Sequence, residues 1–333
     1  MAQMKYFYEL TISSSPHAHS PVTTQTIMRD VLIALVPALL GSIYFFGFRS
    51  LLVTLVSAAA CVFFEWGFCK VRKLHCKTYD LSAVVTGVLL AFVCPVTIPY
   101  WTIILGDFFA IVLVKMLFGG LGKNIVNPAL AGRAFLFSWP VLMSNWVKVG
   151  FSNAAGLLST ADAVTAATPL AVMHQQKMLP EESILDMFLG NIGGCIGETS
   201  ALLLIIGFIY LLYRKVITAR IPLAYIGTVA ILAFLFPQGN DRIAWMAAQV
   251  FGGGLMVGAI FMATDYVTSP LTKLGQIVYG IGCGVITILI RYFGGYSEGV
   301  TYAILCMNAC AVLLDKIGRP VKFGAPKKEA AKK

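Results

Sequence analysis

Apolar stretches long enough to approach the thickness of a bilayer recur along almost the whole chain. A transmembrane helix needs about 20 mainly apolar residues, because the hydrocarbon core is roughly 30 Å thick. Ten stretches qualify, of which the third is short and the fifth is interrupted by Asn127 and Pro128: residues 31–48, 51–69, 80–95, 100–118, 124–146, 191–213, 221–237, 243–264, 274–293 and 299–315. The pattern predicts an all-α integral membrane protein with about ten transmembrane helices.

The scarcity of charge excludes a soluble globular protein. Charged residues make up 12% of the 333 residues and hydrophobic residues 58%, whereas soluble domains carry about 25% charged residues. Membrane lipid must therefore surround the chain. The net charge of +10 includes no basic stripe interleaved with aromatic residues, so we expect no nucleic-acid partner. The eight cysteines are scattered without a Cys-x-x-Cys pair, and we expect no metal site.

The positions of lysine and arginine predict the orientation, since cytoplasmic loops carry an excess of both. Basic residues gather in the connections 70–77 and 214–220 and in the tail 316–333, which ten crossings place on one face. We expect both termini to be cytoplasmic and the loop 147–190 to be extracytoplasmic. The predicted divisions are an N-terminal segment 1–30, a first five-helix repeat 31–146, the loop 147–190, a second five-helix repeat 191–315 and the basic tail 316–333.

Two segments of the chain resemble each other. Gly87 is followed by Val-Thr-Ile-Pro at 96–99, and Gly258 is followed at the same interval by Val-Thr-Ser-Pro at 267–270. Phe-Gly-Gly then occurs at 118–120 and again at 293–295. Five helices in each half would invert the second half, and inverted repeats with broken helices are typical of transporters. The alternative is that glycine and proline are simply common in membrane helices.

The long loop contains a run of small residues around a threonine, Asp-Ala-Val-Thr-Ala-Ala-Thr-Pro-Leu at 162–170. Small side chains let a modifying enzyme approach the backbone, and Pro169 prevents a helix from continuing through Thr168. Taken alone, the run is more typical of a small-residue linker that passes over a surface.

This run resembles the flavinylation motif of the RnfD/NqrB family, in which the last threonine carries FMN through a phosphoester. The resemblance makes Thr168 the attachment residue, with Asp162 opening the motif, Thr165 at its Ser/Thr position and Ala167 before the attachment site. Ala166 stands where glycine is commoner, a departure that the family tolerates.

Two further stretches are similar to segments of the same family. They are Gly-Gly-Leu-Gly-Lys-Asn-Ile-Val-Asn-Pro-Ala at 119–129 and Gly-Asn-Ile-Gly-Gly-Cys-Ile-Gly-Glu-Thr at 190–199. The length is closer to the RnfD branch of the family than to the quinone-reductase branch. The resemblance implies an electron-transfer subunit of an ion-translocating ferredoxin:NAD⁺ oxidoreductase in a bacterial or archaeal inner membrane. Its partners would be the other subunits, one of them flavin-bearing, and a flavin transferase.

The same stretches supply candidate flavin contacts. Glycines admit a flat ring, asparagine amides can bond its edge, and an intramembrane arginine needs a polar partner. The candidates are Gly122, Asn124, Asn127, Arg133, Asn191, Gly194 and Glu198. For Arg133 the partner is either a phosphate or Glu198 or a backbone carbonyl, and the glycines are also typical of helix packing. By analogy with the quinone reductase, a noncovalent riboflavin is a second candidate cofactor.

Four acidic residues lie within or beside the predicted spans, namely Glu65, Asp107, Glu198 and Asp265. Ionisable residues inside a bundle are costly and mark ion pathways by default. They are candidates for a Na⁺ or H⁺ route, and the alternative is that they pair with Lys115 and Arg133. Asp107 and Lys115 are eight residues apart, about 12 Å along a helix, so each needs another partner.

Two other functions are compatible with parts of the sequence. The repeat alone favours a cofactor-free channel or secondary transporter for a small solute. The family resemblance also allows the quinone-reductase subunit. Thr168 separates the first alternative from the electron carrier, because a transporter has no use for a flavin attachment motif. No nucleotide-binding fingerprint or iron–sulfur spacing is present, so we expect no turnover by the isolated chain.

Overall fold

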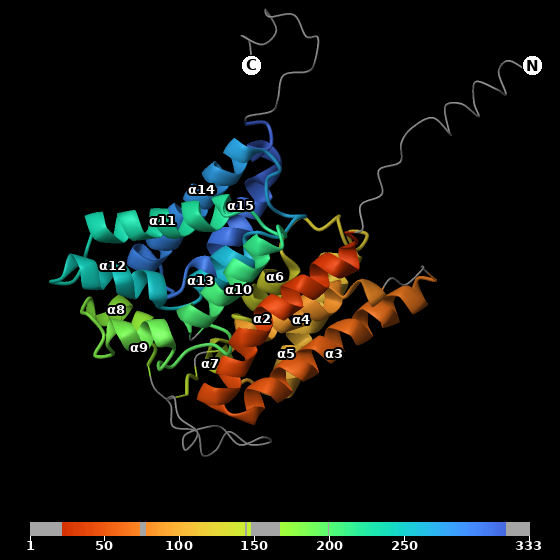
Figure 1. Ribbon diagram of the computed structural model, residues 1–333. Coiled ribbons are helices and arrows are strands. Elements are labelled where there is room, and N and C mark those ends of the chain that lie inside the picture. Colours follow the sequence, from red (N-terminus) through yellow and green to blue (C-terminus); the bar gives the residue numbers. More distant parts are fainter. Residues whose placement is uncertain (1–21, 74–77, 144, 148–166, 199, 318–333) are drawn as a thin grey trace, which may run out of the picture.

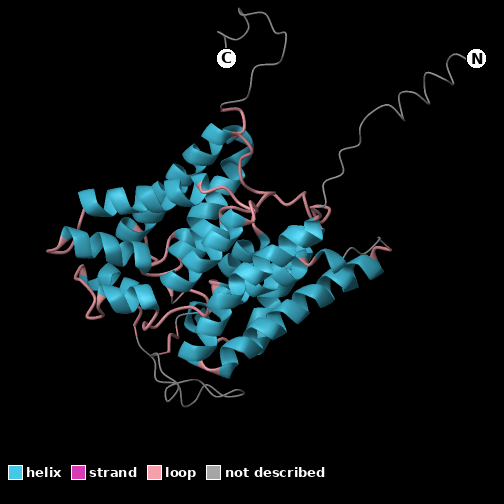
Figure 2. Cartoon of the chain, viewed as in Figure 1, coloured by secondary structure: helices cyan, strands magenta, loops and turns pink. Residues whose placement is uncertain are grey.

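A computed structural model describes residues 22–73, 78–143, 145–147, 167–198 and 200–317, and these ranges contain helices and no β-strand (Figure 2). The all-α prediction is confirmed. The main helices are α2 (Thr24–Phe46), α3 (Phe48–Val71), α4 (Ser82–Phe92), α5 (Tyr100–Phe108) with its π-helical continuation η2 (Phe109–Met116), α6 (Pro128–Leu136), α10 (Ala201–Tyr213), α11 (Arg220–Leu235), α12 (Arg242–Phe251), α14 (Lys273–Phe293) and α15 (Val300–Leu314). Short elements are η1 (Thr78–Asp80), α7 (Pro140–Met143), α8 (Pro169–Gln176), α9 (Ile184–Leu189), α13 (Leu255–Val257) and the π-helix η4 (Gly258–Met262).

Several helices have the length and apolar composition to cross a membrane. They are α2, α3 and α14, and a fourth span is formed if α12 and the segment Leu255–Met262, bent by 61° at their break, are taken together. The apolar helices α4, α10, α11 and α15 are shorter, with 11 to 16 residues. The chain is therefore a multi-pass membrane protein.

Three of the predicted spans are broken rather than continuous. In 124–146 the helix α6 begins only where Asn127 caps it and Pro128 takes its first position, and it ends after nine residues, about 14 Å. In 191–213 the backbone is non-helical until Ser200 caps α10. In 243–264 the glycines at 252–254 separate α12 from α13. The predicted start at residue 31 is also late, because Thr23 caps α2.

The breaks are possible because their backbone groups bond to one another. Non-helical backbone at membrane depth is tolerated only where the protein satisfies it. The amides of Ile196 and Gly197 donate to the carbonyls of Cys94 and Phe92, at 3.0 and 2.9 Å. Arg49 donates to the carbonyls of Val96 and Ile98 at 2.8 and 3.2 Å. A buried arginine of α14, Arg291, similarly donates to the carbonyls of Gln249 and Gly252 at the break after α12.

The early and late helices form two groups that meet along several contacts. Helices α2 to α5 lie on one side of the molecule and α11 to α15 on the other, with α6 and α10 between them (Figure 1). Helix α10 packs along α2, and α15 packs on α6. Asn127 donates to the carbonyl of Met262 in η4 at 3.2 Å, which joins a break in the first group to a break in the second.

Glycine at position 87 sets the spacing between α3 and α4. A Cβ at Gly87 would lie 2.7 Å from Cα of Ala58 and 2.8 Å from the carbonyl oxygen of Ser57. We predict that Gly87→Ala lowers the free energy of unfolding by about 1–3 kcal/mol, as overpacking does. Thermal unfolding of the purified protein in detergent measures it. The matched control is Gly67→Ala on α3, where nothing lies within 4 Å. Equal melting temperatures for the two variants would contradict the close packing.

Candidate functional site

Thr168 is placed at the start of a helix. It is the N-cap of α8, its Oγ1 accepts from the amide of Ala171 at 3.2 Å, and Pro169 follows at the first helical position. The residue is 8% exposed, whereas Ala167 is exposed. The other motif residues Asp162, Thr165 and Ala166 lie outside the described residues. The run of small residues therefore leads directly into a capped helix.

Helix α8 is anchored to the second group of helices. Nδ1 of His174 lies 2.7 Å from the carbonyl oxygen of Arg291 in α14. Leu170 and Met173 are buried, and Leu170 lies against Gly253 at the break after α12. Because its last turn is bonded and its apolar side is buried, α8 holds Thr168 in a defined position.

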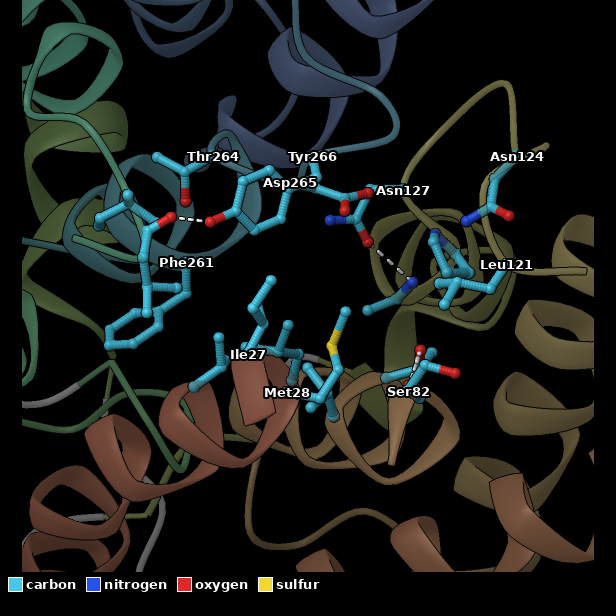
Figure 3. Close-up of a pocket in the computed structure, with 18 of the residues that line it drawn as sticks. Ile27, Met28, Ser82, Leu121, Asn124, Asn127, Phe261, Thr264, Asp265 and Tyr266 are labelled. Atoms are coloured by element: carbon cyan, nitrogen blue, oxygen red, sulfur yellow. Dashed lines mark hydrogen bonds between the residues drawn. The ribbon is translucent and has the colours of Figure 1, made fainter. Parts of the chain in front are cut away.

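Asn124 and Asn127 lie on a cavity of about 80 Å³ between the two groups of helices. Figure 3 shows Ile27 and Met28 from α2 on one side of it and Phe261, Thr264 and Tyr266 on the other. Asp265, a predicted ion-path residue, lines the same cavity, as do Ser82 and Lys115. The structure thus brings two candidate flavin contacts, Asn124 and Asn127, and one candidate ion-path residue, Asp265, to one place.

The two asparagines play different parts. Oδ1 of Asn127 caps α6 by accepting from the amides of Ala129 and Leu130, and its Nδ2 donates to the carbonyl of Met262. Both ends of this side chain are therefore structural. Oδ1 of Asn124 is buried and has no hydrogen-bond partner among the described residues. Gly122 has a φ of +91°, a left-handed conformation that favours glycine.

Arg133 does not reach this cavity and lies in a second polar cluster. Its guanidinium, 1% exposed, is 3.3 Å from Oε1 of Glu198 and 2.5 Å from Oε2 of Glu298. It also donates to Oγ1 of Thr301 at 3.2 Å and lies 3.5 Å from Sγ of Cys195. Of the partners considered for Arg133, the structure shows Glu198, joined by an acid from the second half of the chain.

The remaining candidates of the segment 190–198 are more exposed. Asn191 is exposed and donates to Oδ1 of Asp186 at 3.4 Å, and Gly194 is half-buried. The hydrogen bonds from Ser183 and Asn191 hold the pKa of the Asp186 carboxyl below its ordinary value. Neither Asn191 nor Gly194 lines the cavity of Asn124. The candidate flavin contacts therefore fall into separate places.

Glu298 and Thr301 were missed by the sequence analysis. Glu298 lies in the connection before the predicted helix 299–315 and is not among the four predicted ion-path acids. It is the one acidic residue between positions 266 and 314. That isolation in an apolar region was a usable signal, because lone intramembrane acids are costly.

The predicted ion-path acids have different partners. Glu65 pairs with Nζ of Lys115 at 3.0 Å, and Lys115 also donates to Oγ of Ser82 at 2.7 Å. Asp107, fully buried, accepts from Ser57 at 2.7 Å and from the Cys61 thiol at 3.2 Å. The expectation that Asp107 and Lys115 use different partners is confirmed. Asp265 accepts from Thr268 at 3.1 Å.

Comparison with known proteins places these features in one family. Residues 11–324 match the model of the NQR2, RnfD, RnfE family. The chain is 46% identical over 321 residues to the D subunit of the Na⁺-translocating ferredoxin:NAD⁺ oxidoreductase complex of Acetobacterium woodii, covering 96% of each chain. The chain belongs to the NQR2, RnfD, RnfE family.

Other members of the NQR2, RnfD, RnfE family match over similar lengths. The D subunit of the proton-translocating ferredoxin:NAD⁺ oxidoreductase complex of Clostridium ljungdahlii is 44% identical, covering 94% of this chain and 96% of the relative. The D subunit of an ion-translocating oxidoreductase complex from Actinobacillus succinogenes is 35% identical, covering 93% and 96%. The relative named as Na⁺-translocating and the relative named as proton-translocating are 46% and 44% identical to this chain. Sequence identity therefore does not show which ion is translocated.

The buried ion pair of Lys115 and Glu65 can be tested directly by substitution. Both side chains are at least 93% buried, and removing one partner of a buried pair costs about 3–5 kcal/mol. We predict that Lys115→Met destabilises the protein by this amount, measured by thermal unfolding. The double variant Lys115→Met with Glu65→Leu should recover most of the loss, since no unpaired charge remains. A double variant as unstable as the single one would contradict the pairing.

Proposed function

We propose that this protein is the RnfD-type subunit of a membrane complex that couples ferredoxin:NAD⁺ oxidoreduction to Na⁺ or H⁺ translocation. Within the complex it carries FMN on Thr168 and passes electrons between neighbouring redox centres. The names of the relatives and the family match support the complex, and the motif at 162–168 supports the flavin.

The observation that carries the flavin proposal is the position of the Thr168 hydroxyl at the N-terminus of α8. A helix N-terminus attracts phosphate through its free amides and dipole. A phosphoester on this oxygen would hold the FMN phosphate at that end of the helix, and the oxygen would still accept from the amide of Ala171. The residues that are described therefore fit the group.

The bound isoalloxazine would supply the electron-transfer chemistry, and the chain would fix its position. Helix α8 is held through His174 to α14 and through Leu170 to Gly253. A flavin transferase is needed for maturation, and the electron partners are other subunits, one of them flavin-bearing. The isolated chain has no substrate chemistry of its own in this proposal.

We further propose ten membrane segments in two inverted five-helix repeats, with cytoplasmic termini and an extracytoplasmic flavin loop. Both copies of the repeated Val-Thr-x-Pro motif occupy the same kind of position, between the end of one helix and the start of the next. Val96–Pro99 follows the end of α4 and precedes α5, and Val267–Pro270 follows the end of η4 and precedes α14. Both Phe-Gly-Gly motifs lie at the end of the helix that follows. The charged connections support the orientation.

A noncovalent riboflavin would belong to the cavity of Asn124 and Asn127 in this proposal. The free amide oxygen of Asn124 and the ammonium of Lys115 offer polar contacts there. The cavity of about 80 Å³ is smaller than the roughly 300–1,000 Å³ of typical ligand pockets. The surrounding side chains would have to move apart to admit a riboflavin.

Two alternatives remain distinct from this proposal. A cofactor-free channel or transporter would use the broken helices and the cavity without modifying Thr168. A quinone-reductase subunit would share the flavin and add quinone binding. The state of Thr168 in protein from its native host separates the first alternative.

We predict a covalent FMN on the Thr168 peptide, detected by peptide mass spectrometry after purification from a host with active flavin transferase. Thr168→Ser should keep the adduct, and Thr168→Val should lose it. Because Thr168 also caps α8, Val costs about 1 kcal/mol of helix stability as well. Thr168→Asn separates the two effects, since asparagine caps a helix but cannot form the phosphoester. An unmodified wild-type peptide would favour the channel.

We also predict that at least one of the buried acids takes part in ion translocation. The variants are Glu65→Gln, Asp107→Asn, Glu198→Gln and Asp265→Asn, each assayed in the whole complex in vesicles. Na⁺ uptake and internal pH are measured during ferredoxin-dependent NAD⁺ reduction. Substitution of an acid on the ion path should lower the number of ions moved per electron. Substitution of a structural acid should instead lower the amount of assembled complex. Unchanged transport in all four variants would remove this protein from the ion path.

A further inference from the structure

The cluster around Arg133 joins three separate parts of the chain in the protein interior. Arg133 comes from α6, Glu198 from the segment before α10, and Glu298 from the turn before α15. The side chains of Arg133 and Glu198 are 1% and 2% exposed, and that of Glu298 is 14% exposed. The site thus has a closed end at Glu198 and a more accessible end at Glu298.

The cluster holds more carboxylates than cations. One guanidinium contacts two glutamates. Sγ of Cys195 and one carboxylate oxygen each of Glu198 and Glu298 lie within 4.8 Å of one another. Oε2 of Glu198 is buried and has no hydrogen-bond partner among the described residues. A buried carboxylate with one oxygen that no donor reaches, facing a second carboxylate, is strongly unfavourable unless one of the pair is neutral.

The other polar groups that face the pair do not remove this imbalance. They are Cys94 after α4, Cys195 beside Glu198, Arg291 on α14, and Tyr296 and Tyr302 near Arg133. The one further cation, Arg291, donates to the carbonyls of Gln249 and Gly252 and to the Gln249 side chain. It forms no ion pair with a described residue. A metal cation is disfavoured because the guanidinium already bridges both carboxylates.

We propose that Glu198 and Glu298 hold one proton between them against Arg133, as a proton-exchange site that fills through the more accessible Glu298. One carboxyl donates a hydrogen bond to the other, and the remaining carboxylate balances the guanidinium. A proton leaving the pair would pass to water at Glu298 and leave the interior with one extra negative charge.

The site is adjacent to the helix that begins at Thr168. Leu170 of α8 and Glu298 both lie beside Gly253, so that a Cβ there would lie 2.9 Å from the leucine and 3.2 Å from Oε1 of the glutamate. If Thr168 carries FMN, the charge of the pair and the charge of the flavin would influence each other. This coupling rests on the proposed function, whereas the proton site does not.

Infrared spectroscopy of the assembled complex tests the proton site. The parent complex carries Asp107→Asn in this protein, which removes another buried acid. Each further variant is made in this parent, and its spectrum is subtracted from that of the parent. We expect a protonated carboxylic acid band that shifts in D₂O, is unchanged in the exposed control Glu181→Gln, and is lost in both Glu198→Gln and Glu298→Gln. Each single variant leaves one carboxylate for Arg133 and should fold.

Several results would overturn the site. One is a band that survives either glutamine substitution, and another is a parent complex without a glutamate carboxylic acid band. If neither variant assembles, ¹³C labelling of the glutamate carboxyls in the parent complex must still shift the frequency of the carboxylic acid band. A labelled parent with no shift would also reject the proposal. So would a melting temperature of the parent that rises with Na⁺ at constant ionic strength and depends on both glutamates, because the pair would then bind a metal cation.

The coupling has its own measurement. The reduction potential of the Thr168-bound flavin should change its slope against pH in Glu198→Gln relative to Glu181→Gln. An equal slope in both would reject the coupling and leave the proton site standing. A chain without flavin on Thr168 would reject the proposed function and the coupling, and the infrared result would still decide the proton site.

Discussion

The fold depends on internal partners for the backbone that its broken helices expose. The break after α4 and the segment before α10 bond to each other through Ile196 and Gly197. Arg49 and Arg291 then donate to the carbonyls of further breaks. Lipid offers no hydrogen bonds to such groups, so arginines that would be costly in a plain helix bundle become structural here. The same breaks provide the cavity of Asn124 and the cluster of Arg133.

The cavity of Asn124 and the cluster of Arg133 lie beside different elements of the fold. The cavity lies between α2, the segment 121–129 and the end of η4, so both groups of helices line it. The Arg133 cluster lies beside α8, which begins at Thr168. Thr168, the proposed attachment residue, therefore caps a helix that lies beside the buried glutamate pair, while the cavity offers a separate polar region with Asp265 and Lys115.

The sequence predicted the helix class, the membrane setting and several helix ends well, although α2 begins at Thr24 and not at the predicted residue 31. Predicted 274–293 and observed Lys273–Phe293 differ by one residue, because apolar composition is a local signal that needs no distant partner. The span 191–213 failed because apolar composition cannot distinguish a helix from a buried loop whose partners are distant. Glu298 was missed for the same reason, since its contact with Arg133 joins positions 165 residues apart. The motif predicts Thr168 as the attachment residue, which stays a prediction, and the structure adds that Thr168 caps α8.

The placement of the Arg133 cluster limits how charge can change in this protein. Its members come from α6, the segment before α10 and the turn before α15, so a proton gained or lost there acts on contacts between these three parts. A guanidinium that bridges two carboxylates can keep one of them when the other is neutral, but it cannot balance both. The number of protons on the pair therefore determines whether these three parts attract or strain one another. In the proposed function, a change of charge on a flavin at Thr168 would act on this cluster through α8.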